Sequence, residues 1–308
     1  MRKRKHSERG LWLFLLSIPF IAYIILFCYV PLFGWSLAFF DYKPGMDLRH
    51  LNFAGLKYFK LIFQFWPDTR NALINTLALS GLNYIFSPLP MILAIFLYEL
   101  RSSKLRKFVQ TVVTLPNFVS WIIVYSLCFS LFSWDGLLNQ VLMSLGLTDK
   151  PVQLLADARH AWIFQTLIGQ WKCLGWSSIV YLAAIAGIDT QLYDAARVDG
   201  ASRFGCILHV TMPGIMPTFL VLFVISVGNH RVVKNKILSV GFDQYFVFNN
   251  PMVASKLEVL DLYTYRLGIG TQDFSFATAV GILKSAVSIA SIFLINSFAK
   301  RIRGETII

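Results

Sequence analysis

Apolar residues along this chain gather into long runs that polar segments separate. The runs are Leu11–Phe33, Ala72–Leu97, Val109–Phe132, Trp162–Gly187, Pro213–Gly228 and Phe276–Phe298. A helix needs about 20 mostly apolar residues to cross roughly 30 Å of hydrocarbon. Five runs meet that standard and Pro213–Gly228 comes close, so the pattern predicts an all-α integral membrane protein with six transmembrane helices.

The composition favours a membrane protein over an ordinary soluble one. Hydrophobic residues make up 56% of the 308 residues, charged residues make up 14%, and the mean hydropathy is +0.61. Soluble domains carry about 25% charged residues, so this chain has too few charges to cover a soluble surface. Its four cysteines lack both a disulfide framework and the paired spacing of a zinc site, and we expect no metal site.

Basic residues lie near the ends of the apolar runs and give the chain a net charge of +12. Taken together, the N-terminus, the segments after the second and fourth runs and the C-terminal tail hold these residues at about twice the density of the opposite loops, 14 in about 57 residues against 12 in about 107. The positive-inside rule then places both termini of this multi-pass membrane protein in the cytoplasm. Because these residues would lie against anionic membrane lipids, the charge requires no nucleic-acid partner.

We expect three parts along the chain. Residues 1–40 hold a basic segment and the first helix, residues 70–300 form a five-helix core, and residues 301–308 form a cytoplasmic tail. The first run exceeds the roughly 7–15-residue apolar core of a signal peptide, so we expect it to be retained. A basic stretch at 230–236 shortens the fifth run, and it is either an insertion at the outer mouth or a sequence anomaly.

Several polar residues interrupt the apolar runs. Asn75, Asn83 and Ser87 fall on one helical face, and Lys172 and Lys284 lie well inside their runs. A lysine at mid-membrane costs roughly 2.5–3.5 kcal/mol on insertion scales, so each lysine should face a cavity or a partner. Two interpretations stay open for all of them: hydrogen bonds to neighbouring helices, or the lining of a solute path.

Trp176 lies close to Lys172 and has the ring chemistry to stack on a sugar. Tryptophan also populates membrane interfaces and helix-bundle cores, so this alternative stays open as well. The candidate residues of a translocation path are therefore Asn83, Lys172, Trp176 and Lys284.

The segment between the fourth and fifth runs, residues 188–214, has the pattern of two short helices around a turn. Its first helix has an apolar face made of Leu192, Ala195, Ala196 and Val198. Gly200 permits a left-handed backbone at the turn, and Pro213 is suited to begin the next membrane helix. A short helix that displays small residues can fit into a groove on another protein.

A fixed spacing of residues within this loop identifies a family. Asp194, Ala195 and Ala196 are followed by Gly200, Val210 and then Met212 and Pro213. This spacing resembles the EAA loop of permease subunits in binding-protein-dependent ABC importers, whose pattern is Glu-Ala-Ala, three residues, Gly, nine residues, an aliphatic, one residue and Leu-Pro. The departures are Asp for Glu, Val for Ile and Met for Leu.

The resemblance implies the type I ABC importer permease fold, with six transmembrane helices and a cytoplasmic coupling loop between helices four and five. It also implies a second homologous permease subunit in a heterodimer, two ATP-binding subunits, and an extracellular or lipid-anchored solute-binding protein. The chain itself has no GxxxxGK[ST] signature, so we expect ATP and Mg to be bound by the partner subunits. We therefore expect neither a cofactor nor catalytic residues in this chain.

Further stretches resemble carbohydrate-uptake permeases of the polysaccharide or oligosaccharide type. They are Trp171-Lys172, Gly175-Trp176, Gly241–Gln244, Asn250-Pro251, Tyr263–Arg266 and Phe274–Gly281. The resemblance implies carbohydrate import by alternating access. The alternatives are an importer of a non-sugar solute, a membrane-embedded enzyme and an uncoupled channel. The scattered acids and histidines disfavour the enzyme, and an ATPase that co-purifies with the chain would exclude the channel.

Overall fold

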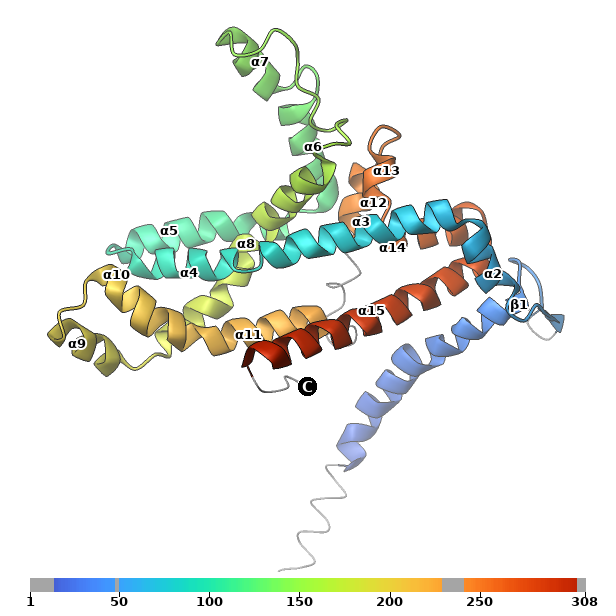
Figure 1. The fold of residues 1–308 in the computed structure, drawn as a ribbon, viewed down its shortest axis with the longest axis horizontal. Coiled ribbons are helices and arrows are strands. Elements are labelled where there is room, and N and C mark those ends of the chain that lie inside the picture. The colour runs from blue at the N-terminus through green and yellow to red at the C-terminus, as the bar shows by residue number, and fades with distance from the viewer. Residues whose placement is uncertain (1–13, 48–49, 229–240, 304–308) are drawn as a thin grey trace, which may run out of the picture. The chain divides into compact units, whose positions relative to one another are not determined.

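The chain is mostly helical in a computed structural model, which describes residues 14–47, 50–228 and 241–303 (Figure 1). It divides into two compact units. The first comprises residues 1–69 and 263–286, and the second comprises residues 70–262 and 287–308. The basic stretch at 230–236 and the last five residues of the predicted tail lie outside the described residues.

The helices and strands follow one another from a helical segment, Phe14–Phe39, to α15. In chain order they are η1 (Ile25–Tyr29), η2 (Val30–Phe39), β1 (Phe40–Asp41), β2 (Asn52–Phe53), α2 (Lys57–Gln64), α3 (Trp66–Ile85), α4 (Leu89–Glu99), α5 (Ser103–Thr114), η4 (Leu115–Phe118), α6 (Trp121–Phe132), α7 (Leu137–Ser144), α8 (Ala161–Ala186), α9 (Thr190–Val198), α10 (Arg203–Cys206), η5 (Ile207–Thr211), α11 (Met212–Gly228), α12 (Phe242–Phe248), α13 (Ala254–Leu257), α14 (Leu260–Tyr265), η6 (Arg266–Gly270) and α15 (Phe274–Arg303). The two short strands pair antiparallel.

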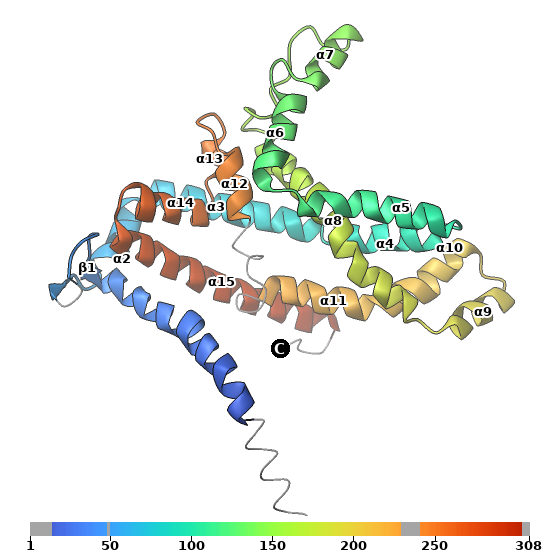
Figure 2. The ribbon, with the colours of Figure 1, turned by 180° about the vertical axis from the view of Figure 1, so that it is seen from behind.

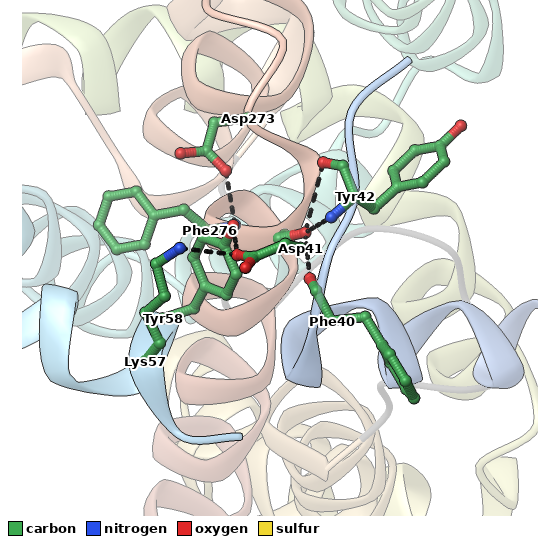
Figure 3. A network of polar contacts seen from close by, with 8 residues as sticks. Phe40, Asp41, Tyr42, Lys57, Tyr58, Asp273 and Phe276 are labelled. Carbon is green, nitrogen blue, oxygen red and sulfur yellow. Dashed lines mark hydrogen bonds and ion pairs between the residues drawn. The ribbon is translucent and has the colours of Figure 1, made fainter. Parts of the chain in front are cut away.

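A polar network in the first unit joins β1, α2 and the start of α15 (Figure 3). The Asp41 carboxylate accepts hydrogen bonds from Lys57 Nζ and from the Tyr58 hydroxyl, each at 2.7 Å. The Ser275 hydroxyl donates to the Phe40 carbonyl at 2.7 Å. The bond from Lys57, followed by that from Tyr58, holds the pKa of Asp41 below its usual value, and burial raises the pKa of Tyr58 to about 12. The network fixes the strand after the first helical segment against α15.

The second unit packs around two clusters of buried apolar side chains. Helices α4, α5 and α8 lie side by side in both views (Figures 1 and 2). The cluster between α4, α8 and α11 consists of Met91, Ala94, Ile95, Tyr181, Ile185 and Ile215. The other cluster joins α3, α6 and the start of α8 to the segment that contains α12, α13 and α14. Within a bilayer such close packing, rather than removal from water, holds helices together.

Within the described residues, four helical segments are long and apolar enough to cross a membrane. They are Phe14–Phe39, Trp66–Glu99, Trp121–Ser144 and Arg203–Phe223. A fifth results if α8 and α9, which are bent by 69°, count as one span, and α15 adds the shorter apolar stretch Phe274–Ala290. The predicted all-α membrane class is thus confirmed. Judged by helix length and composition, the described residues contain four or five spans, whereas the sequence pattern predicts six.

The third apolar run is not the single helix that the pattern predicts. α5 ends at Thr114, the 3₁₀ turn η4 follows, and α6 begins only at Trp121. Pro116 lies in that turn and has no backbone N–H to donate, so the α-helical ladder cannot continue through it. The second run is interrupted in the same way between α3 and α4, beside Pro88.

The helix predicted from the fifth apolar run begins earlier than expected. The chain is helical without a break from Arg203 to Gly228, so Pro213 lies inside a helix and does not begin one. The π-helix η5 ends at Thr211, two residues before Pro213. A π turn is wider than an α turn, and it leaves room where the proline ring would otherwise meet the carbonyl four residues earlier. The loop's second short helix is therefore continuous with the membrane helix.

Candidate functional site

The 188–214 loop folds as two helices joined at Gly200. Asp189 caps α9 because its carboxylate accepts a hydrogen bond from the Gln191 N–H at 2.9 Å. Gly200 has a φ of +82°, in the left-handed region where a side chain would be strained. Ser202 caps α10 by accepting a hydrogen bond from the Gly205 N–H at 3.2 Å. The structure shows the two helices and the turn that the sequence predicts.

One face of α9 is apolar and exposed. Leu192 is 55% exposed and Val198 is 89% exposed, and Ala195 between them is exposed as well. Ala196 is half-buried, so it belongs only in part to the predicted face. Apolar side chains this exposed on a short polar helix are typical of a surface that another protein covers.

Asp194 lies on the exposed side of the same helix. Its carboxylate accepts a hydrogen bond from Arg197 Nη1 at 3.1 Å, and both side chains are about 70% exposed. A pair this exposed contributes little stability because water screens it. The Asp194 carboxylate is therefore accessible to a further partner.

The opposite side of α9 is attached to the helix that follows the loop. Tyr193 is buried, and its hydroxyl is hydrogen-bonded to the Thr211 hydroxyl at 3.0 Å. Ile188 lies against Gly214 so closely that an added Cβ there would be 2.7 Å from Ile188 Cδ1. In the sequence, helical spacing places Tyr193 off the apolar face of α9. Sequence reasoning did not otherwise identify its bond to Thr211.

The start of α10 has a second, weaker attachment. Arg203 Nη2 lies 3.7 Å from the Glu99 carboxylate at the end of α4. Among the other predicted loop residues, Val210 is half-buried in η5, and Pro213 is exposed within the continuous helix. The loop is thus tied to α4 and α11 on one side and open on the other.

Lys172 is buried and hydrogen-bonded to backbone. Its Nζ donates to the carbonyls of Pro116 at 3.1 Å and Asn117 at 2.9 Å, and the side chain is 7% exposed. The same ammonium lies 5.3 Å from the ring centre of Trp121. Lys172 therefore adds a donor to two carbonyls at the break, of which that of Pro116 also accepts a hydrogen bond from the Val119 N–H. These bonds agree with the hydrogen-bonding interpretation, and a place on the solute path stays a prediction.

The polar face of the second run makes two separate contacts. Asn75 donates to the carbonyls of Ser255, in α13, and of Glu258, the residue that follows α13. Asn83 instead accepts a hydrogen bond from Gln170 Nε2 on α8 at 3.2 Å. Sequence reasoning did not single out Gln170, and only its position two residues before Lys172 pointed to it. Asn83 and Lys172 thus both hold α8 near its midpoint.

Trp176 lies one turn beyond Lys172 on α8, and its side chain is 51% exposed. Its ring meets the ring of Phe118 edge-on, with centroids 5.6 Å apart, and Phe118 is itself 72% exposed. Lys172 and Trp176 therefore lie on one stretch of α8, and Asn83 of α3 contacts the same stretch through Gln170. Lys284 lies half-buried on α15 in the other unit. Among the described residues, no three His, Cys, Asp or Glu side chains gather as metal ligands.

Comparison with known proteins identifies relatives along nearly the whole chain. Residues 87–304 match the family described as binding-protein-dependent transport system inner membrane component. The chain is 38% identical over 300 residues to the polygalacturonan/rhamnogalacturonan transport system permease protein YteP of Bacillus subtilis, covering 96% of this chain and 90% of that protein. It is also 38% identical over 302 residues to Protein LplB of Bacillus subtilis, covering 97% and 91%.

A solved structure shares the fold. It is a bacterial alginate ABC transporter in complex with an alginate pentasaccharide-bound periplasmic protein. One of its chains superimposes with a TM-score of 0.84 at 34% identity, covering 98% of this chain and 99% of that one. These findings confirm the predicted ABC permease and exclude the enzyme. The chain belongs to the binding-protein-dependent transport system inner membrane components and is a permease subunit of an ABC importer.

Proposed function

We propose that this chain forms, with a second permease, the path by which an oligosaccharide enters a bacterial cell. The relatives support the substrate class. YteP is named for polygalacturonan and rhamnogalacturonan, and the solved relative belongs to an importer of alginate, an acidic polysaccharide. Galacturonate and alginate units both carry carboxylates, so we favour an acidic oligosaccharide over a neutral one and any sugar over a non-sugar solute.

The assembly that we propose contains several other proteins. A second homologous permease completes the path as a heterodimer, two ATP-binding subunits hold ATP and Mg, and an extracellular or lipid-anchored protein delivers the solute. The solved relative in complex with its periplasmic protein supports the last of these partners. The chain itself carries no phosphate-binding signature, which supports a separate ATPase.

The exposed apolar face of α9 carries this proposal. Leu192 and Val198 face outward, while Tyr193 on the other side is bonded into the protein. A helix that is open on one face and attached on the other can be bound by an ATPase and pass its movement to the membrane helices. We therefore propose that the 188–214 loop is the cytoplasmic coupling loop, with Asp194, Ala195 and Gly200 at its contact.

The membrane arrangement that we propose has six helices with both termini in the cytoplasm. The third helix is the broken pair of α5 and α6, the fourth is α8 and the sixth is α15. The density of basic residues on the N-terminal side supports this orientation.

The solute path that we propose runs beside the breaks at mid-membrane. Transporter sites commonly form at discontinuous helices near the bilayer midplane. Lys172 and Asn83 hold α8 beside the break at η4, and Trp176 presents an exposed ring next to them. We propose that Trp176 contacts the sugar and that Lys172 and Asn83 position Trp176 by holding α8. Lys284 on α15 is a further candidate for a residue of the path.

The test replaces Gly200 with valine in the assembled complex. Gly146 offers a matched control, because it also has a positive φ, +66°, and also has open space around it. Each valine adds backbone strain of roughly 1–2 kcal/mol. We expect Gly200→Val to abolish most solute-stimulated ATP hydrolysis and uptake, and Gly146→Val to leave both near the parent level. Equal behaviour of the two variants would contradict the coupling role.

A further inference from the structure

The hydroxyl pair of Tyr193 and Thr211 connects the two helices of the 188–214 loop. Thr211 is 1% exposed and Tyr193 is 9% exposed, so water does not compete for their hydrogen bond of 3.0 Å. The two residues stand 18 positions apart, on α9 and at the last residue of η5. This bond therefore joins α9 to the base of the membrane helix that continues through α11.

The other attachments of the loop are weaker or less directional. The ion pair of Arg203 and Glu99 spans 3.7 Å with Arg203 65% exposed, so water and salt screen it. The contact of Ile188 with Gly214 is apolar and contains no directional bond. Among the described residues, Tyr193 and Thr211 make the one buried side-chain hydrogen bond between α9 and the helix after the turn.

The bond lies where a displacement of α9 would reach the membrane. Helix from Arg203 to Gly228 is unbroken, so a force applied at Thr211 acts on the start of a span. The alternative route runs along the backbone through Gly200, where an added Cβ would meet nothing within 4 Å.

We infer that the Tyr193–Thr211 hydrogen bond is the link through which movement of α9 reaches the fifth membrane helix. The inference rests on the proposed coupling role of the loop. Tyr193 and Thr211 act as positioning residues, because they touch neither ATP nor the solute. When the bond is missing, α9 still binds the ATPase, but its displacement is partly lost in rotation about Gly200.

The experiment measures the amount of solute imported per ATP hydrolysed by the complete transporter in liposomes. We expect Tyr193→Phe and Thr211→Val each to lower this ratio roughly 2- to 10-fold, as expected for loss of one hydrogen bond. Thr211→Ser keeps a hydroxyl and should retain most of the ratio. The matched control is Tyr181→Phe, which removes a hydroxyl from another buried tyrosine of the same unit and should leave the ratio unchanged.

A double variant separates the link from general damage. Because both changes break one bond, Tyr193→Phe with Thr211→Val should lower the ratio no further than either change alone. An unchanged ratio in Tyr193→Phe, or additive losses in the double variant, would overturn the inference. Failure of the proposed function would look different, because the ATP-binding subunits would then not co-purify even with the parent chain.

Discussion

At the residue scale, Gly175 shows how closely α8 approaches its neighbour. A Cβ added to Gly175 would lie 2.1 Å from the Val113 carbonyl oxygen and 2.6 Å from the Thr114 nitrogen. Both atoms belong to backbone at the end of α5, which cannot move aside as a side chain can. This close contact stands one turn from Lys172, so both residues hold α8 against the break between α5 and α6.

We predict that Gly175→Ala destabilises the protein, because the added methyl group overlaps backbone atoms. Overpacking of this kind costs roughly 1–3 kcal/mol or more. Gly81 in α3 is the control, since a Cβ there meets nothing within 4 Å. Gly81→Ala should be neutral or stabilising by up to about 1 kcal/mol, as expected for alanine in a helix. Thermal unfolding in detergent measures both, and equal midpoints for the two variants would contradict the packing.

At the element scale, the segment that contains α12 to α14 is held by long-range bonds to other helices. Asn75 and Asn71 on α3 both donate to the Ser255 carbonyl, at 3.0 and 2.9 Å. The Trp162 Nε1–H donates to the Lys256 carbonyl at 2.8 Å. Because α13 has only four residues, its last carbonyls have no donors within the helix, and these side chains supply them.

We predict that Asn75→Ala lowers stability by about 1–3 kcal/mol, because the Asn75 side chain is fully buried and alanine leaves the Glu258 carbonyl without its donation. Asn71→Ala removes a bond to the Ser255 carbonyl from an exposed position, where water replaces it, and should change stability by less than about 0.5 kcal/mol. Unfolding midpoints of the purified transporter compare the two. A loss for Asn71→Ala as large as that for Asn75→Ala would contradict the assigned burial.

The sequence predicts the elements better than it predicts their breaks. The apolar runs locate the helices, and Gly200 locates the turn of the 188–214 loop. Pro116 marks the third run as irregular, but it does not say that the helix separates into α5 and α6. Pro213 is misleading, because a proline suits both the start of a helix and a position after a π turn.

The sequence does not predict which distant segments contact one another. Asn75 and Ser255 are 180 residues apart, and Tyr193 and Thr211 depend on how α9 folds back. Helical spacing places a side chain on a face, but it does not say which other helix that face meets. The sequence could therefore offer two roles for Asn83 and Lys172. The structure shows the hydrogen bonds that each side chain makes, and their role in a solute path stays a prediction.

At the scale of the whole molecule, transport requires a connection from a cytoplasmic ATPase to a path within the membrane. The chain offers an exposed contact at α9, a buried bond at Thr211 and an unbroken helix into the membrane. The ring of Trp176 and the bonded Lys172 stand on α8, whose last turn precedes the same loop. The 188–214 loop thus connects α8 with the helix that continues into α11, the two helices that must move in the proposed mechanism.

The most direct test labels Val198→Cys with a maleimide that cannot cross membranes, in a chain whose exposed native thiol is removed as Cys28→Ser. Val198 is 89% exposed, so a cysteine there should react freely. We predict no labelling in right-side-out vesicles, labelling in inverted vesicles that lack the ATP-binding subunits, and protection when those subunits are bound. Labelling from the outside, or equal labelling with and without the ATP-binding subunits, would contradict the account.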